Sequence, residues 1–265
     1  MAAWPSSIIP VVKIATWNVN SIRARIDLVA DWLVRQHPDL VCLQETKVVD
    51  DLFLVDAIAA AGYRAAFAGE RTYNGVAILM REPLEDVRVD FPLADNPDRR
   101  LISGVCQGIR FHSAYFPNGR APGTEHFLAK LRWIDALGEL VVRSRDASPV
   151  VLLGDFNVAP EPRDVYDPVA MEGQIHFTPD ERAAIQRLLD RGLVDAFRIA
   201  CEDAGVYSWW DYRAGAFRRN LGLRIDHVFA SAVLADHVTA AAVDVDERGK
   251  PSCSDHAPVI VELDL

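Results

Sequence analysis

The stretch Val150-Val151-Leu152-Leu153-Gly154-Asp155-Phe156-Asn157 is an apolar run that ends in a carboxylate and an amide. The four consecutive aliphatic residues predict a buried β-strand, whereas Asp155 and Asn157 have no reason to lie in a core. Sheet proteins place active sites at strand ends that carry such groups. Several other segments of the chain share this arrangement.

Short apolar runs predict the strands, and amphipathic segments between some of them predict helices. The predicted strands are residues 11–15, 40–43, 76–80, 87–91, 101–106, 111–116, 150–153, 225–229 and 259–263. Helices are predicted at 22–33 with Ser21 as N-cap, at 124–143, and from the N-cap Thr178 to Gly192. The strands between residues 76 and 116 have no helix between them, which favours antiparallel pairing. The chain is therefore predicted to be an α/β protein with mixed sheets and outer helices.

The chain has 265 residues, of which half are hydrophobic and a quarter are charged. No long linker divides it, so residues 1–265 are predicted to form a single domain, with residues 1–10 as a flexible tail. Lys and Arg number 28 against 38 Asp and Glu, and the net charge of −10 excludes a surface that attracts nucleic acid as a whole. Any basic surface must be local. Residues 209–226 carry a small positive excess, whereas residues 155–181 are strongly acidic.

No run of about 18 apolar residues is present, which excludes a transmembrane helix. The N-terminal residues lack the basic and apolar regions of a signal peptide. We therefore expect a cytoplasmic protein with no membrane partner. The four cysteines, at positions 42, 106, 201 and 253, lack the spacing of a zinc site or a disulfide framework and are predicted to be reduced core residues.

Polar residues follow three further predicted strands: Asn18 the first, Glu45 the second, and Asn118 the strand that ends at Tyr115. Each alone has a plain structural explanation as a turn former or a solvated charge. Their recurrence at four strand ends, including that of Asp155, predicts that they share one site.

The C-terminal third adds a carboxylate and an imidazole. Asp226 lies within an otherwise apolar strand, where a buried carboxylate needs a cationic or donor partner. His256 is the candidate partner, held in one tautomer and favoured in its protonated form. The alternative is that Asp226 is a surface residue of an edge strand and that His256 is a turn histidine.

The oxygen-bearing groups suit a hard divalent cation such as Mg²⁺ or Mn²⁺. A protonated histidine and amides would stabilise negative charge on a phosphoryl oxygen, and a free carboxylate could take a proton from water. This combination predicts in-line hydrolysis of a phosphate ester. No GxSxG, GxGxxG or P-loop motif is present, so neither a serine nucleophile nor a nucleotide cofactor is indicated.

Seven blocks in order carry a family resemblance. They are Thr16-Trp17-Asn18-Val19-Asn20-Ser21, Leu43-Gln44-Glu45-Thr46-Lys47, Tyr115-Phe116-Pro117-Asn118-Gly119, Gly154-Asp155-Phe156-Asn157, Ser208-Trp209-Trp210-Asp211-Tyr212-Arg213, Gly222-Leu223-Arg224-Ile225-Asp226 and Ser254-Asp255-His256-Ala257-Pro258. The set resembles the exonuclease III group of the endonuclease/exonuclease/phosphatase superfamily. The resemblance implies a four-layer α/β sandwich, in which two mixed β-sheets pack face to face with helices on the outside.

The resemblance also implies roles for individual residues. The metal set would be Asn18, Glu45, Asp155, Asn157, Asp255 and His256, with Glu45 as principal ligand. The catalytic set would be Tyr115, Asp155, Asn157, Asp226 and His256, in which Asp155 orients or deprotonates the attacking water. The DNA-binding set would be Tyr73, Asn74, Asn118, Trp209, Arg213, Arg218, Arg219, Asn220, Leu223 and Ile225. Trp209, Leu223 and Ile225 would line a pocket for an abasic sugar, whereas Trp210 is expected to be core.

The implied protein is a monomeric, Mg²⁺- or Mn²⁺-dependent repair nuclease that acts on double-stranded DNA with abasic sites or 3′ ends. Two alternatives remain open. One is a phosphoesterase of the same superfamily with a non-DNA substrate, against which residues 209–226 argue. The other is a catalytically inactive nucleic-acid-binding regulator, which should have lost some of the metal or phosphate groups, whereas all of them are present.

Overall fold

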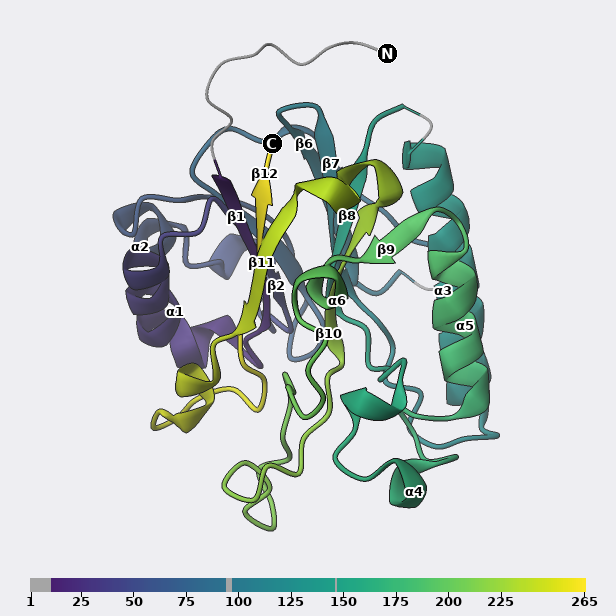
Figure 1. Ribbon diagram of the computed structural model, residues 1–265. Helices are drawn as coiled ribbons and strands as arrows, with labels where there is room; N and C mark the ends of the chain where they lie inside the picture. The colour runs from purple at the N-terminus through teal and green to yellow at the C-terminus, as the bar shows by residue number, and fades with distance from the viewer. Residues whose placement is uncertain (1–10, 94–96, 146) are drawn as a thin grey trace.

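Two six-stranded sheets face each other in the computed structural model, which describes residues 11–93, 97–145 and 147–265 (Figure 1). Helices lie on the outer face of each sheet, so the layers run helix, sheet, sheet, helix. The predicted tail at residues 1–10 lies outside the described residues. No helix in the described part of the chain is both long enough and apolar enough to cross a membrane.

The first sheet has the order β11-β12-β1-β2-β4-β3. Its strands are β1 (Val11–Asn18), β2 (Leu40–Gln44), β3 (Arg64–Ala68), β4 (Val76–Met80), β11 (Val238–Val243) and β12 (Val259–Asp264). β1 and β2 are parallel, and the other neighbours are antiparallel. The sheet is therefore mixed, and Asn18 and Gln44 end at the same edge.

The second sheet has the order β5-β6-β7-β8-β10-β9. Its strands are β5 (Glu85–Val89), β6 (Leu101–Cys106), β7 (Ile109–Tyr115), β8 (Val150–Asp155), β9 (Leu193–Asp195) and β10 (Asp226–Ser231). β7 and β8 are parallel, which brings Tyr115 beside Asp155. β10 is antiparallel to β8 and begins at Asp226, whose register partner is also Asp155.

The outer helices are α1 (Ile22–Gln36) and α2 (Val55–Ala60) over the first sheet, and α3 (Glu125–Arg145) and α5 (Pro179–Leu189) over the second (Figure 1). Two short helices, α4 (Pro168–Met171) and α6 (Ala196–Ala200), lie in connecting segments. Short 3₁₀ segments occur at Asp50–Leu52, Pro162–Asp164, Ala232–His237 and Val245–Gly249.

Successive side chains of a strand point to opposite faces of its sheet, and both faces of each sheet are covered here. In β2, Leu40 and Cys42 belong to the core between the sheets, whereas Val41 and Leu43 pack under α1 and α2. A third apolar cluster fills the space between the second sheet and α3 and α5. Both sheets are thus covered on both sides, and polar side chains are brought together at one end of the sandwich.

The predicted mixed sheets are confirmed, and so is the two-sheet sandwich that the resemblance implied. Three strands have no counterpart among the predicted ones: β3, β9 and β11. Ser21 is the N-cap residue of α1, as predicted, but its side chain makes no capping hydrogen bond; its backbone has a φ of 92° and its N–H binds Glu45 O instead. The Thr178 cap is as expected, with Glu181 completing a capping box.

Candidate active site

The amide of Asn18 joins the two sheets at the edge where their parallel strands end. Its Nδ2 donates to Glu45 Oε1 at 2.8 Å and to Asp155 Oδ2 at 2.9 Å. Glu45 follows β2 of the first sheet, and Asp155 ends β8 of the second. The two carboxylates, 110 positions apart in the chain, therefore share one donor.

His256 lies between two buried carboxylates. Its Nδ1 is 2.8 Å from Asp226 Oδ2, and its Nε2 is 3.8 Å from Asp155 Oδ2. The Ser208 hydroxyl donates to the same Asp226 oxygen at 2.6 Å. All four side chains are buried. The pairing of Asp226 with His256 is thus present, and Asp226 is at the start of a central strand rather than on a surface edge.

Burial and neighbouring charge set the protonation of this group. Burial alone would lower the pKa of His256, but the charges of Asp226 and Asp155 raise it to about 10. Burial raises the pKa of Asp155 to about 7, with His256 opposing and Asp226 adding to the rise. The imidazole therefore carries a proton at neutral pH and can donate from Nε2.

Glu45 and Tyr115 complete the polar lining near Asp155. Burial opposes ionisation of Glu45, but hydrogen bonds from Asn18 and Lys47 and the charge of Lys47 lower its pKa below the ordinary value. Burial and the charges of Glu45 and Asp155 raise the pKa of Tyr115 well above the ordinary value. Tyr115 therefore stays a hydroxyl donor, whereas Glu45 is an anion.

Two loop amides, Asn118 and Asn157, lie together on the side of the second sheet. Asn118 Nδ2 donates to Asn157 Oδ1 at 3.2 Å, and Asn157 Nδ2 donates to Phe116 O at 3.1 Å. Each NH₂ group has two hydrogens, so one N–H on each amide stays available to a ligand. The Asn157 oxygen, which the resemblance assigned to a metal, is already engaged by Asn118.

Asp255 lies on the side of the first sheet. Its Oδ2 accepts from Trp209 Nε1 at 3.1 Å, and its Oδ1 accepts from Asn20 Nδ2 at 3.0 Å. Asn20 also accepts from Lys47 Nζ at 2.6 Å, and Lys47 pairs with Glu45. A continuous polar chain thus links Asp255 to Glu45 through these two residues.

The donor set fits a hard cation. Asp155, Asp226 and His256 each place an atom within 4.8 Å of the others, and because His256 is protonated the two carboxylates are the groups of this cluster that could bind the cation. Asp226 Oδ1 is buried and has no hydrogen-bond partner among the described residues. An unpartnered buried carboxylate oxygen is costly unless a cation or water satisfies it, and oxygen donors are those that Mg²⁺ and Mn²⁺ prefer.

A hollow of about 530 Å³ borders this polar group through Trp209. Residues that line it include Tyr166, Met171, His176, Trp209, Arg213 and Leu223. The His176 ring is 6.3 Å from the Trp209 ring. Of the predicted pocket residues, Trp209 and Leu223 line the hollow, whereas Ile225 packs beneath it with Leu223. Trp210 is core, as expected.

The predicted DNA-binding residues divide by exposure. Tyr73, Arg213, Arg218, Arg219 and Asn220 are exposed on loops. Asn74 is instead buried and bonded to Glu70, and its carbonyl oxygen accepts from Lys47 N. Asn74 therefore supports the loop after Glu45 rather than forming surface.

Four residues at the site had no predicted role: Asn20, Lys47, His176 and Ser208. Asn20 and Lys47 stand inside the quoted blocks, so a role for them could have been inferred. Ser208 also stands in a quoted block, but only the fold shows that its hydroxyl reaches Asp226. His176 is isolated in the sequence, where no pattern links it to Trp209.

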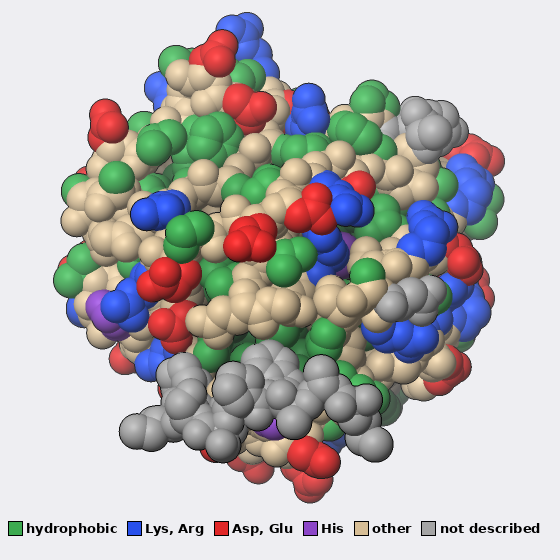
Figure 2. All heavy atoms as spheres, turned by 90° about the horizontal axis from the view of Figure 1, so that it is seen from above, with side chains coloured by type: hydrophobic (Ala, Val, Ile, Leu, Met, Phe, Trp, Pro, Cys, Tyr) green, Lys and Arg blue, Asp and Glu red, His purple; other side chains and the backbone are tan. Residues whose placement is uncertain are grey.

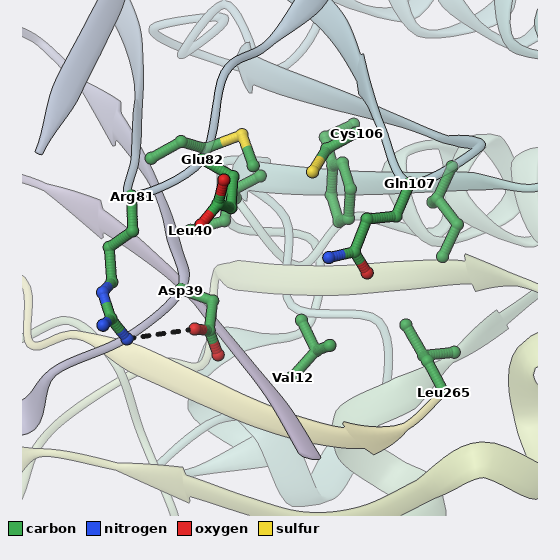
Figure 3. A pocket seen from close by; sticks show the side chains of 11 residues that line it. Val12, Asp39, Leu40, Arg81, Glu82, Cys106, Gln107 and Leu265 are labelled. Atoms are coloured by element: carbon green, nitrogen blue, oxygen red, sulfur yellow. Dashed lines mark hydrogen bonds and ion pairs between the residues drawn. The ribbon is translucent and has the colours of Figure 1, made fainter. Parts of the chain in front are cut away.

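A second cavity, of about 150 Å³, lies at the opposite end of the sandwich (Figure 3). Val12, Leu40, Cys106 and Leu265 line it, and an Asp39–Arg81 ion pair lies at its side. Val12 and Leu40 lie at the start of β1 and β2, the strands whose other ends reach the polar group. Figure 2 views this end, where acidic, basic and apolar side chains are interspersed.

Comparison with known proteins identifies a family model, described as the endonuclease/exonuclease/phosphatase family, that matches residues 15–256. An exodeoxyribonuclease of Bacillus subtilis is 34% identical over 96% of this chain and 100% of its own length. Exodeoxyribonuclease III of Haemophilus influenzae is 33% identical over 95% of this chain and 100% of its own length.

The chain is also similar to solved structures over almost its whole length. A 3′ phosphatase from Neisseria bound to a product DNA hairpin superposes with a TM-score of 0.94 at 40% identity, covering 96% of this chain and 100% of that one. An AP endonuclease from Archaeoglobus fulgidus gives a TM-score of 0.92 at 36% identity, with the same coverage.

Proposed function

Because the chain belongs to the endonuclease/exonuclease/phosphatase family, we propose that it is a metal-dependent DNA repair phosphodiesterase of exonuclease III type. The substrate is double-stranded DNA, attacked at abasic sites and at 3′ ends, including 3′-phosphates. The observation that carries this proposal is the buried group of Asp155, Asp226 and His256, in which a protonated imidazole stands between two carboxylates.

The side chains have complementary roles in this proposal. Asp155 takes a proton from the attacking water, and Asp226 holds the His256 ring so that Nε2–H points toward a phosphoryl oxygen. Asn118 and Asn157 supply their remaining N–H groups to the phosphate, and Tyr115 supplies its hydroxyl. These donors stabilise the charge that grows on the non-bridging oxygens as the P–O bond breaks.

A divalent cation, Mg²⁺ or Mn²⁺, would be held mainly by Glu45 and Asp155, with Asp226 Oδ1 as a further free oxygen. When bound, it supplies positive charge near the phosphoryl oxygens and the leaving oxygen. Glu45 is anionic already, because its pKa is lowered by Asn18 and Lys47 despite burial. When no cation is bound, the Lys47 ammonium group neutralises the charge of the Glu45 carboxylate.

The DNA surface is local, as the net charge requires. Arg213 has 91% of its side chain exposed, and Arg218 and Arg219 are exposed beside it. Such arginines bind the phosphate backbone without regard to sequence. The hollow at Trp209 receives the sugar of an abasic nucleotide. The protein acts as a monomer.

The test uses duplex DNA with one abasic analogue and, separately, duplex DNA with a 3′-phosphate. We expect Mg²⁺-dependent incision or 3′-end processing that EDTA abolishes and added Mg²⁺ restores. The Asp155→Asn protein, purified in parallel, controls for contaminating nucleases. If neither substrate is processed in a metal-dependent way, the proposal is contradicted, and a non-DNA phosphoesterase or a binding protein is favoured.

A further inference from the structure

Lys130 is a wholly buried lysine on α3 that reaches the loops of the active site from behind. Its Nζ donates to Asn157 O at 2.7 Å, to Asn118 O at 3.2 Å and to Glu181, which is also wholly buried. An ammonium group has three hydrogens, so its donors are fully used. Lys130 therefore has no proton left for substrate.

Glu181 on α5 is equally saturated. One of its carboxylate oxygens accepts from Lys130 and from His176 N at 3.2 Å. The other accepts from Thr178 N at 3.1 Å and from Thr178 Oγ1 at 2.8 Å, which forms the capping box of α5. The carboxylate thus ties Lys130 to the turn that carries His176.

The two carbonyls that Lys130 binds belong to Asn118 and Asn157, whose side-chain amides face the phosphate in the proposed function. Asn157 has a φ of 53°, a left-handed conformation that needs support from its neighbours. Its carbonyl oxygen also accepts from His176 Nδ1 at 2.7 Å, which fixes that ring's tautomer with the proton on Nδ1. One buried cation thereby fixes both amides and the ring beside Trp209.

Packing excludes a loose arrangement. A Cβ atom at Gly119 would lie 2.9 Å from Lys130 Cδ, and the Gly119 φ is 85°. The loop after Asn118 therefore lies directly on the aliphatic part of the lysine. Position 119 has both the left-handed backbone and the lack of space that favour glycine.

We infer that the Lys130–Glu181 pair is a positioning element for the phosphate-binding amides of Asn118 and Asn157. It acts through the backbone carbonyls of both loops and touches neither substrate nor metal. The inference rests on the proposed function for its effect on turnover, but its effect on loop order is independent of any substrate.

The test compares Lys130→Met, which keeps the length of the side chain and removes its three donors, with Leu137→Ala. Leu137 is a buried residue of the same helix, in the apolar cluster under α3 that also includes Phe116 and Phe156, so its truncation destabilises this region without removing a hydrogen bond to either loop. We expect Lys130→Met to lower kcat by about 10–100-fold with little change in KM, since small displacements of reacting groups have effects of this size. Leu137→Ala should keep the kcat of the wild type at temperatures where both variants are folded.

A double variant, Lys130→Met with Glu181→Gln, separates positioning from stability. It removes the buried negative charge that the single variant leaves without its cation and keeps an amide oxygen for the Thr178 cap, so its Tm should exceed that of Lys130→Met. Its kcat should stay low. Recovery of kcat along with Tm, or an equal loss in Leu137→Ala, would overturn the inference.

Amide hydrogen exchange gives a readout that needs no activity. Peptides covering residues 116–120 and 155–158 should exchange faster in Lys130→Met than in the wild type, and by more than in Leu137→Ala when the two variants are compared at equal unfolding free energy. Unaltered exchange in both peptides contradicts the positioning role whatever the substrate is. A wild-type protein inactive on DNA, with faster exchange in Lys130→Met, would instead reject the proposed function alone.

Discussion

Two buried charged groups lie on either side of β10, and they differ in how completely they are paired. At the start of β10, Asp155, Asp226 and His256 combine two carboxylates with one imidazole, and Asp226 Oδ1 has no partner among the described residues. We call this the catalytic group. The second group pairs two arginines with two aspartates.

This second group, the structural group, consists of Asp164, Asp195, Arg198 and Arg224. Arg224 donates to Asp164 at 2.7 Å and 3.1 Å and to Asp195 at 2.8 Å, and Arg198 also binds Asp164. Burial opposes ionisation of Asp164, but the arginines lower its pKa to about 2. The group is neutral overall, and its carboxylates hold the segment before α4 against the segment before β10.

The contrast shows how buried charge divides between stability and function. Two arginines balance two aspartates in the structural group, in which Arg198 Nε is the buried polar atom without a partner among the described residues, so the group has no excess charge to attract a cation. The catalytic group has excess negative charge and a free carboxylate oxygen, and stays incomplete until a cation and substrate arrive. Balance of charge, rather than burial, distinguishes the two.

The largest effect is expected at the catalytic group. Asp155→Asn removes the proton acceptor while keeping the side-chain volume, so kcat should fall about 10²–10⁴-fold. DNA affinity should be largely retained, because the exposed arginines supply it. Single-turnover cleavage and a binding titration with the same duplex measure both quantities. Equal loss of binding and turnover would make Asp155 a structural residue and remove the contrast.

The structural group should respond in stability. Arg224→Met leaves Asp164 and Asp195 with fewer buried partners, and breaking a buried pair in this way costs about 3–5 kcal/mol of unfolding free energy. Urea unfolding measures the change. Arg187→Met is the matched control, because its exposed pair with Asp135 should contribute less than about 1 kcal/mol. A fully stable Arg224→Met protein would show that the charge-balanced network is dispensable.

His112 on β7 is a single buried imidazole that belongs to neither group. Neither of its ring nitrogens has a partner among the described residues. Burial, with the charge of Arg110 adding, lowers its pKa from 6.5 to about 3. Below pH 6.5 the unfolded chain takes up a proton on this ring, whereas the folded chain does not until about pH 3, so the unfolding free energy falls as the pH is lowered from 6.5 toward 3.

His112→Leu should therefore raise the unfolding free energy by about 1–3 kcal/mol at pH 8, because an unpartnered polar group is removed. The gain should be larger at pH 5, by about 2 kcal/mol. Urea unfolding at both pH values checks the sign, and kcat should not change. A destabilised variant with reduced kcat would mean that isolated unpaired groups also serve function.

Much of the fold could be predicted because the central strands are rich in Val, Ile and Leu. The missed strands β3 and β11 read Arg64-Ala65-Ala66-Phe67-Ala68 and Val238-Thr239-Ala240-Ala241-Ala242-Val243. Alanine carries little apolar signal and little strand preference, so these segments form strands only through their neighbours. β9 has only three residues, too few to show a period.

The sequence indicated that polar residues gather at the strand ends, but it did not indicate which charged residues pair in the interior. Arg224 contributed to the positive excess counted for residues 209–226, and Asp164 to the acidity of residues 155–181, yet they neutralise each other in the interior. Summing charge along a segment cannot detect a pair formed across 60 positions. The pairing of Lys130 with Glu181 could not be predicted for the same reason, since each alone is an ordinary charged residue on an amphipathic helix.

The hydrogen bonds of Asn18 to Glu45 and Asp155 have a consequence for the molecule as a whole. Since the three residues come from facing sheets, the distance between the two carboxylates is set by how the sheets stack, and so by every side chain in the core between them. The apolar interior is therefore part of the catalytic apparatus in a mechanical sense. A substitution that shifts one sheet relative to the other should therefore lower kcat, even if each sheet keeps its own structure.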